Sequence, residues 1–134
     1  MNASPPNGTA IRVLVVDQDK SRRDALVAIL LSEGFQSQAV TNRHETLDVM
    51  ENEQFDLVIM NVHGTEAIGT IIAIRAYEPE TKIIAISEGP AAQGFLPLAK
   101  SLGASGLLGD AMDLGKLRDA IHSLLAPDLH QLAS

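Results

Sequence analysis

Four segments of the sequence place polar side chains directly or shortly after an apolar run. These side chains are Asp17 and Gln18, Asn61, Ser87, and Asp110. Carboxylates and hydroxyls take part in metal and phosphate chemistry, whereas amides donate and accept hydrogen bonds without carrying a charge. The sequence contains no recognisable catalytic triad, paired-carboxylate site or zinc signature. We therefore expect a binding or signalling protein and no enzyme.

The apolar runs that precede these side chains predict strands buried on both faces. They are Val13–Val16, Leu57–Met60 and Ile83–Ile86. Continuous apolar runs of this kind are typical of parallel sheets that helices cover on both sides, because half-exposed strands alternate instead. Two weaker strands are expected at Gln36–Val40 and Gly106–Leu108.

Segments with helical spacing lie between the predicted strands. The first helix is expected to begin near Lys20, with Asp19 as its N-cap and Gly34 just past its end. Asn42 and Glu45 have the spacing of a capping box at the start of the second helix. The expected buried faces are Leu26, Ile29 and Leu30 in the first helix, Leu47 and Met50 in the second, and Ile68, Ile71 and Ile72 in the third.

The last two helices are read from proline and aspartate positions. We expect the fourth to begin near Phe95, with Pro97 in its first turn. Asp113 is expected to cap the fifth, whose apolar residues fall at helical intervals. These are Leu114, Leu117, Ile121 and Leu124. Residues 1–10 and 127–134 are predicted to be tails, so that one domain spans residues 11–126.

Alternation of five strands with five helices predicts an α/β protein with one doubly wound parallel sheet. Right-handed crossovers place helices on both faces, and the flavodoxin-like strand order 2-1-3-4-5 is expected. In such sheets the functional crevice lies beyond the carboxyl ends of the strands, where the strand order reverses. The polar side chains named first are therefore expected to meet in one crevice.

Composition and charge narrow the classes of partner. The chain has 17 acidic and 10 basic residues and a formal net charge of −7, so its surface repels nucleic acid on average. It has no cysteine, which excludes disulfides and thiolate metal sites. The polar start does not resemble a signal peptide, and no apolar stretch is long enough to span a membrane. We expect a cytoplasmic protein of 134 residues that has no room for a separate output domain.

Four sequence blocks resemble the signatures of bacterial response-regulator receiver domains, the CheY-like superfamily. They are VLVVDQD at 13–19, DLVIMNVHG at 56–64, IIAIS at 83–87 and GASGLLGDAMDL at 103–114. The blocks follow one another in the order and spacing of that family, and the resemblance covers about residues 10–126. It implies the same doubly wound fold and a place in two-component or phosphorelay signalling.

The resemblance also assigns positions in the crevice. Receivers bind Mg²⁺ with two adjacent acids and an aspartate that accepts the phosphoryl group, which a hydroxyl and a lysine then contact. Here Asp17 matches the first acid and Ser87 the hydroxyl, whereas Gln18 stands at the second acid, Asn61 at the phospho-acceptor and Asp110 at the lysine. The chain is thus identified as a degenerate, pseudo-receiver member of the family.

Two further positions depart from the family pattern. Leu107 occupies the position of the aromatic residue that commonly rotates when a receiver switches, and Ala111 replaces the usual proline after the lysine.

These substitutions predict that the crevice has lost its phosphoryl chemistry. An amide is not an anionic nucleophile, so Asn61 is not expected to be phosphorylated. With Asp17 as the one expected ligand retained, Mg²⁺ binding is predicted to be weak or absent. An acid at position 110 turns an attraction into a repulsion of roughly 4 kcal/mol at ~4 Å and an effective dielectric of ~20.

Two interpretations of the altered crevice remain open. Lys20 is an alternative source of the missing cation, by pairing with Asp17 or Asp110, while Arg22 and Arg23 are expected on the exposed side of the first helix. Alternatively, amide hydrogen bonds of Gln18 and Asn61 lock the pocket without a metal.

The predicted function is a phosphorylation-independent receiver module that acts by protein–protein contact. Its partner is expected to be a histidine kinase, a phosphotransfer protein or an effector, bound through the face of the fourth helix, fifth strand and fifth helix, which can also serve a homodimer. The apolar residues considered for this face, most of them expected in the core, are Phe95, Leu96, Leu98, Leu102 and Met112. The alternative is a small-molecule sensor that uses the altered crevice. No cofactor is expected.

Overall fold

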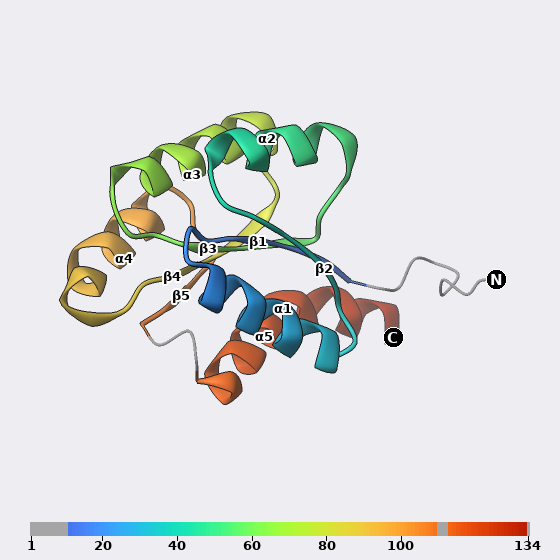
Figure 1. The fold of residues 1–134 in the computed structure, drawn as a ribbon. Coiled ribbons are helices and arrows are strands. Elements are labelled where there is room, and N and C mark those ends of the chain that lie inside the picture. Colours follow the sequence, from blue (N-terminus) through green and yellow to red (C-terminus); the bar gives the residue numbers. More distant parts are fainter. Residues whose placement is uncertain (1–10, 110–112, 134) are drawn as a thin grey trace.

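Five parallel strands form one sheet in the order β2-β1-β3-β4-β5, as the sequence predicted (Figure 1). The computed structural model describes residues 11–109 and 113–133. The strands are β1 (Arg12–Val16), β2 (Gln36–Val40), β3 (Leu57–Asn61), β4 (Lys82–Ile86) and β5 (Gly106–Leu108). β1, β3 and β4 each include one polar residue beyond the predicted apolar run. Backbone pairing explains the extension, because Arg12 still pairs with Gln36 and Asn61 with Ile86.

Helices cover both faces of the sheet. They are α1 (Lys20–Ser32), α2 (Arg43–Asn52), α3 (Thr65–Tyr77), the short 3₁₀ helix η2 (Gly89–Ala91), α4 (Ala92–Ser101) and α5 (Leu114–Ala133). Figure 1 shows α1 and α5 on one face and α2, α3 and α4 on the other. The helices do not cover the carboxyl edge of the sheet, where the loops that carry the polar side chains follow the strands.

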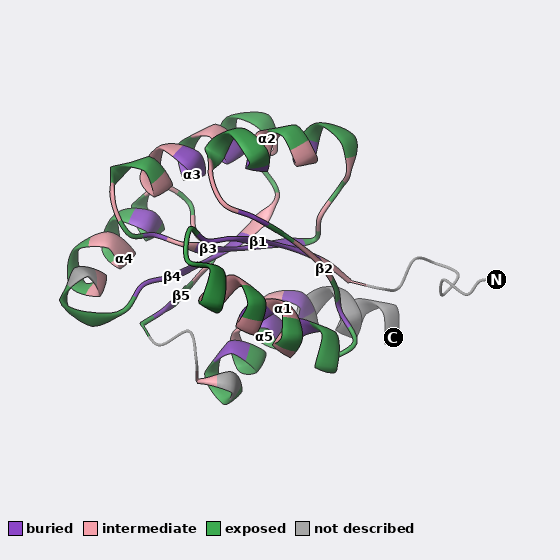
Figure 2. Cartoon of the chain, viewed as in Figure 1, coloured by how far each residue is buried: buried purple, intermediate pink, exposed green. Residues whose placement is uncertain are grey.

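Successive side chains along each central strand point to opposite faces of the sheet and pack into two separate hydrophobic cores. On β1, Val13 and Val15 pack with α1 and α5, whereas Leu14 and Val16 pack towards α3 and α4. Buried residues accordingly run along the middle of the sheet in Figure 2. The prediction of strands buried on both faces is confirmed for β1, β3 and β4.

The predicted buried face of α3 is wrong for Ile72, and Ile68 is only half-buried. Ile71 is buried, but Ile72 is 52% exposed, and Ile74 takes its place in the core. Consecutive helical residues point about 100° apart, so a stripe through residues 67, 71 and 74 turns residue 72 towards solvent. In α2, Met50 is buried as predicted, whereas Leu47 is only half-buried.

Helix α4 begins at Ala92 and not near Phe95, so Pro97 lies inside the helix and outside its first turn. The earlier start follows from η2, whose last turn lets the Ala92 N–H donate to the carbonyls of Gly89 and Pro90. Pro97 has no N–H and therefore leaves one helical hydrogen bond unmade.

Helix α5 continues through residue 127, where a loose tail was predicted. The Asp113 carboxylate accepts from the Lys116 N–H at 3.1 Å, which confirms the predicted cap. The helix then runs to Ala133. In the sequence, Leu129 and Leu132 continue the apolar spacing beyond Leu125, a pattern that favours helix despite Pro127. The predicted N-terminal tail lies outside the described residues.

The caps of α1 and α2 place the loops around the crevice. The Asp19 carboxylate accepts from the Arg22 N–H at 2.8 Å, and the Asn42 side chain accepts from the Glu45 N–H at 2.9 Å, as predicted. The Glu45 carboxylate, however, accepts from the backbone N–H and hydroxyl of Thr41, and not from the backbone of Asn42. These bonds lower the pKa of Glu45.

The loop before β5 depends on a glycine packed against an arginine. Gly103 has φ +105°, and a Cβ there would lie 2.7 Å from Nε of Arg75, whose Nη2 donates to the Gly103 carbonyl at 2.8 Å. We expect Gly103→Ala to lower the free energy of unfolding by about 2 kcal/mol, because it adds backbone strain and displaces Arg75. Urea denaturation followed by circular dichroism measures the change.

Gly34→Ala is the matched control for this prediction. Gly34 also has a positive φ, +87°, but a Cβ there would meet nothing within 4 Å. Gly34→Ala should therefore lower the free energy of unfolding by less than Gly103→Ala does, by about 1 kcal/mol. Equal losses at the two positions would contradict the role given to Arg75.

Candidate functional site

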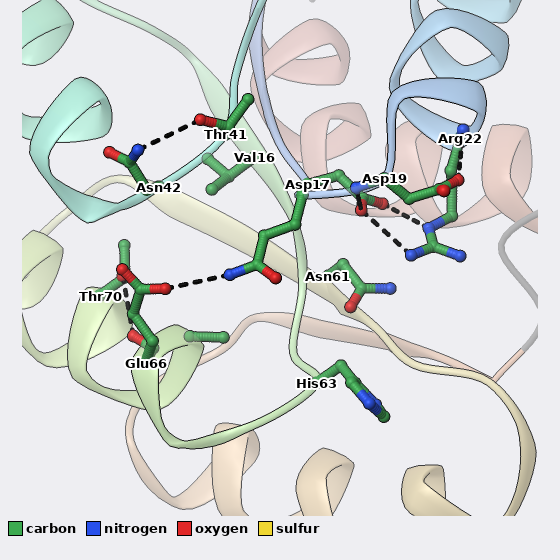
Figure 3. A pocket seen from close by; sticks show the side chains of 12 residues that line it. Val16, Asp17, Asp19, Arg22, Thr41, Asn42, Asn61, His63, Glu66 and Thr70 are labelled. Atoms are coloured by element: carbon green, nitrogen blue, oxygen red, sulfur yellow. Dashed lines mark hydrogen bonds and ion pairs between the residues drawn. The ribbon is translucent and has the colours of Figure 1, made fainter.

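A polar cleft of about 240 Å³ opens at the carboxyl ends of β1 and β3. Asp17, Gln18 and Asn61, three of the residues singled out in the sequence, line it. The residues just before α2 and the first turns of α3 complete the lining (Figure 3). The topology explains their meeting, because β1 and β3 are adjacent although about 40 residues separate them.

Asp17 is bound by an arginine of the following helix. The side chain of Asp17 is buried, with the residue 2% exposed, and its two carboxylate oxygens accept from Nε and Nη2 of Arg22, the latter at 3.1 Å (Figure 3). The hydrogen bond to Asp17 raises the pKa of Arg22. A fork of two N–H donors on one carboxylate fixes both side chains in orientation.

Arginines of α1 also form bonds to the loop after β1 and to the loop after β4. Arg22 reaches across to Glu88 after β4, with 3.4 Å between Nη1 and Oε1. Arg23 donates to the backbone carbonyls of Asp17 at 2.9 Å and Gln18 at 3.0 Å. The expectation that Arg22 and Arg23 lie on the exposed side of the helix is therefore wrong, and both position the loop after β1.

Lys20 does not supply a cation to the crevice. Its Nζ lies 2.8 Å from the Asp24 carboxylate one turn further along α1, and both side chains are exposed. This pair lowers the pKa of Asp24. The alternative in which Lys20 pairs with Asp17 is wrong, because at the first position of the helix its side chain points outwards. Asp110, the other partner considered for Lys20, lies outside the described residues.

The amides of the crevice do not bond to each other. Gln18 donates from Nε2 to the Glu66 carboxylate on α3 at 3.0 Å. Asn61 has no side-chain hydrogen bond to any residue that the structure describes. Its amide faces a second hollow of about 250 Å³, which Arg22, His63 and Glu88 also line. Of the predicted amide network, the structure therefore contains the hydrogen bond of Gln18 to Glu66 and none from Asn61 among the described residues.

Ser87 directly follows β4, but it is not among the described residues that line either hollow of the crevice. The residue is 1% exposed, and its N–H donates to the Leu108 carbonyl at 3.0 Å. Its hydroxyl has no hydrogen-bond partner within residues 11–109 and 113–133. Asp110 and Ala111, which the sequence placed in the same crevice, lie outside the described residues.

Of the apolar residues on the face of α4 and β5, some are packed in the core and others are exposed to solvent. Phe95, Leu96 and Leu102 pack against the core, as the sequence favoured, whereas Leu98 on α4 and Leu107 on β5 are exposed. Met112 lies outside the described residues.

The described part of the chain contains no group of three or more His, Cys, Asp or Glu side chains placed to hold a metal ion. No described helix combines the length and apolar character that crossing a membrane requires.

Arg22 is the functional residue that sequence reasoning missed. In a strand–helix unit the first helical turn lies beside the end of the strand, so a long side chain there can turn back towards it. The signal was an arginine three residues after the Asp19 cap and five after Asp17. Helical periodicity alone assigned it to the solvent side.

Comparisons with known proteins identify a family and individual relatives to which the chain is similar. The family profile described as response regulator receiver domain matches residues 13–122. Sporulation initiation phosphotransferase F of Bacillus subtilis is 26% identical over 119 residues, which cover 85% of this chain and 93% of that protein.

Solved structures show the same architecture. A CheY-like response regulator receiver domain protein of Methanospirillum hungatei JF-1 superposes with a TM-score of 0.81 at 22% identity, covering 92% of this chain and 99% of the other. The response regulator TrrA of Thermotoga maritima, in complex with Mg²⁺ and BeF, gives 0.75 at 24% identity and covers 86% and 99%. At these identities the two structures show a shared fold alone.

Proposed function

The chain belongs to the response regulator receiver domain family, and on that premise we propose that it serves two-component or phosphorelay signalling without being phosphorylated. It acts by binding a protein partner, which is a histidine kinase, a phosphotransfer protein or an effector. The crevice then has a single conformation, and the partner binds the surface of the protein in that conformation.

The observation that carries this proposal is the pairing of Asp17 with Arg22. Both oxygens of the one carboxylate retained from the family's metal set accept from the guanidinium. The side chains at the two other metal positions, Gln18 and Asn61, are neutral amides. Mg²⁺ in phosphoryl-transfer sites needs carboxylate ligands, so the residues present do not fit it.

The residue at the acceptor position supports the same conclusion. A phosphoryl acceptor attacks with an anionic oxygen lone pair, and the amide oxygen of Asn61 carries no charge. The sequence has an acid, Asp110, where the family has the lysine that pairs with the phosphoryl group. All three features of the reaction are therefore altered together: the nucleophile, the metal ligands and the countercharge.

The sensor alternative has less support. The two hollows of the crevice, about 240 and 250 Å³, are lined mainly by charged and amide side chains, whereas small-molecule sites are lined predominantly by hydrophobic and aromatic ones. A protein partner needs no such cavity, and the exposed Leu98 and Leu107 lie on the face considered for it.

Intact-mass spectrometry tests the proposal directly. After incubation with Mg²⁺ and a small phosphodonor such as acetyl phosphate, we expect the mass to stay unchanged, with no species heavier by about 80 Da. A phosphorylated receiver from another protein, treated in parallel, shows that the donor is active. A stable adduct that maps to the peptide containing Asn61 would overturn the proposal.

A further inference from the structure

We propose that Arg22 is the resident cation of the crevice, and that its guanidinium keeps divalent metal ions away from Asp17. The inference deepens the proposed function, on which it rests, by naming the group that holds the crevice in its metal-free state. It concerns binding only and involves no chemical step.

The contacts of Arg22 make it a counter-ion and a link between loops. Nε and Nη2 donate to the two oxygens of Asp17 after β1, and Nη1 faces Glu88 after β4. Burying a carboxylate as deeply as that of Asp17 costs free energy unless a cation pairs with it. Arg22 supplies this cation from within the chain and joins both loops in doing so.

Charge around the crevice shows what the loss of Arg22 would leave. Among the described residues that line its two hollows, Arg22 is the only lysine or arginine. The carboxylates that line them are those of Asp17, Asp19, Glu66 and Glu88. Without the guanidinium of Arg22, the nearest remaining cation is Arg23, which donates to the backbone carbonyls of Asp17 and Gln18 and not to a carboxylate. Carboxylate oxygens that lack a paired cation attract Mg²⁺ or Mn²⁺.

The experiment compares the thermal stability of wild type, Arg22→Ala and Arg22→Lys in MgCl₂ and in NaCl of equal ionic strength. Calorimetry or circular dichroism is used, because the chain has no tryptophan. We expect Arg22→Ala to lower the Tm by roughly 10 °C in NaCl. Arg22→Lys should recover part of that loss, since an ammonium keeps the charge without the two-donor fork.

Metal dependence separates a cation role from a merely structural one. The MgCl₂ concentration is set about tenfold above the dissociation constant of Mg²⁺ for Arg22→Ala. Under this condition the Tm of Arg22→Ala should be roughly 4 °C higher than in NaCl, whereas the Tm of wild type should not change. Lys20→Ala, which removes an exposed cation paired with Asp24 on the same helix, is the matched control and should gain nothing. Adding Asp17→Asn to Arg22→Ala should abolish the gain.

Binding of Mn²⁺, followed by electron paramagnetic resonance, gives a second measurement. We expect at least tenfold tighter binding to Arg22→Ala than to wild type, and Arg22→Gln serves if the alanine variant does not fold. Equal Mn²⁺ affinity in wild type and the folded variant would overturn the inference, as would a Mg²⁺ gain that survives Asp17→Asn. Phosphorylation of wild type would overturn the proposed function alone, because the metal measurements do not depend on Asn61 reacting.

Discussion

Restoring the acceptor alone, by Asn61→Asp, is expected to leave phosphorylation by acetyl phosphate at least about 100-fold slower than restoring the whole family pattern. The complete variant carries Gln18→Asp, Asn61→Asp and Asp110→Lys. The rate of appearance of a species heavier by about 80 Da in intact-mass spectra measures the difference.

The expectation follows from what the new carboxylate lacks. In the single variant, Asp17 remains bound to Arg22 and position 18 remains an amide, so that Mg²⁺ finds too few free carboxylates. A cation or donor that stabilises the developing charge is worth about 10²–10³ in rate at sites of this kind. In the complete variant three carboxylates face one guanidinium, which leaves ligands for the metal, and a lysine is again available for the phosphoryl group.

Two variants control the comparison. Gln18→Asp with Asp110→Lys, which keeps Asn61, should form no adduct, because the metal ligands and lysine are then present without a nucleophile. Adding Asn61→Ala to that pair, in place of Asn61→Asp, should likewise give no adduct. Comparable rates for the single and the complete variants would contradict the importance given to the metal ligands.

Leu14→Ala is expected to lower the free energy of unfolding by about 3 kcal/mol. Leu14 is 0% exposed and lies at the middle of β1, paired on one side with Gln38 of β2 and on the other with Val58 of β3. The change removes buried methylene groups and leaves a cavity that a rigid sheet cannot close. Urea denaturation with circular dichroism measures the loss, which is a large part of the roughly 5–15 kcal/mol usual for a domain.

Leu31→Ala is the matched control, because it makes the same chemical change at a residue that is 72% exposed on α1. Its effect should stay within about 0.5 kcal/mol of zero. A loss at Leu31 equal to that at Leu14 would contradict the assignment of the core to the central strands.

Most of the fold was predictable because each apolar run had one physical interpretation. Val13–Val16 carries four apolar residues in succession, and only a strand covered on both faces buries them all. The errors in helix boundaries fall where two local preferences compete. Pro97 favoured a late start of α4 and Pro127 an early end of α5, and in both places the helix continues through the proline.

The site was predictable as a set of residues but not as a set of bonds. Asp17 and Asn61 come together because strand order and direction place the ends of β1 and β3 side by side. The partners of those residues follow a different logic. Arg22 and Lys20 lie two positions apart on α1, yet one binds Asp17 and the other Asp24.

Residue type and spacing along the chain were enough to predict the strands and their order, and the resemblance to receivers assigned Asp17, Gln18 and Asn61 to one crevice. The cation that serves Asp17 depends instead on how the elements pack in three dimensions. A guanidinium reaches several ångströms beyond its Cα, and the phase of α1 against the sheet selects the one arginine whose donors meet that buried carboxylate. The pairing therefore arises from the packing of helix on sheet, which the five-residue spacing of Asp17 and Arg22 permits but does not by itself determine.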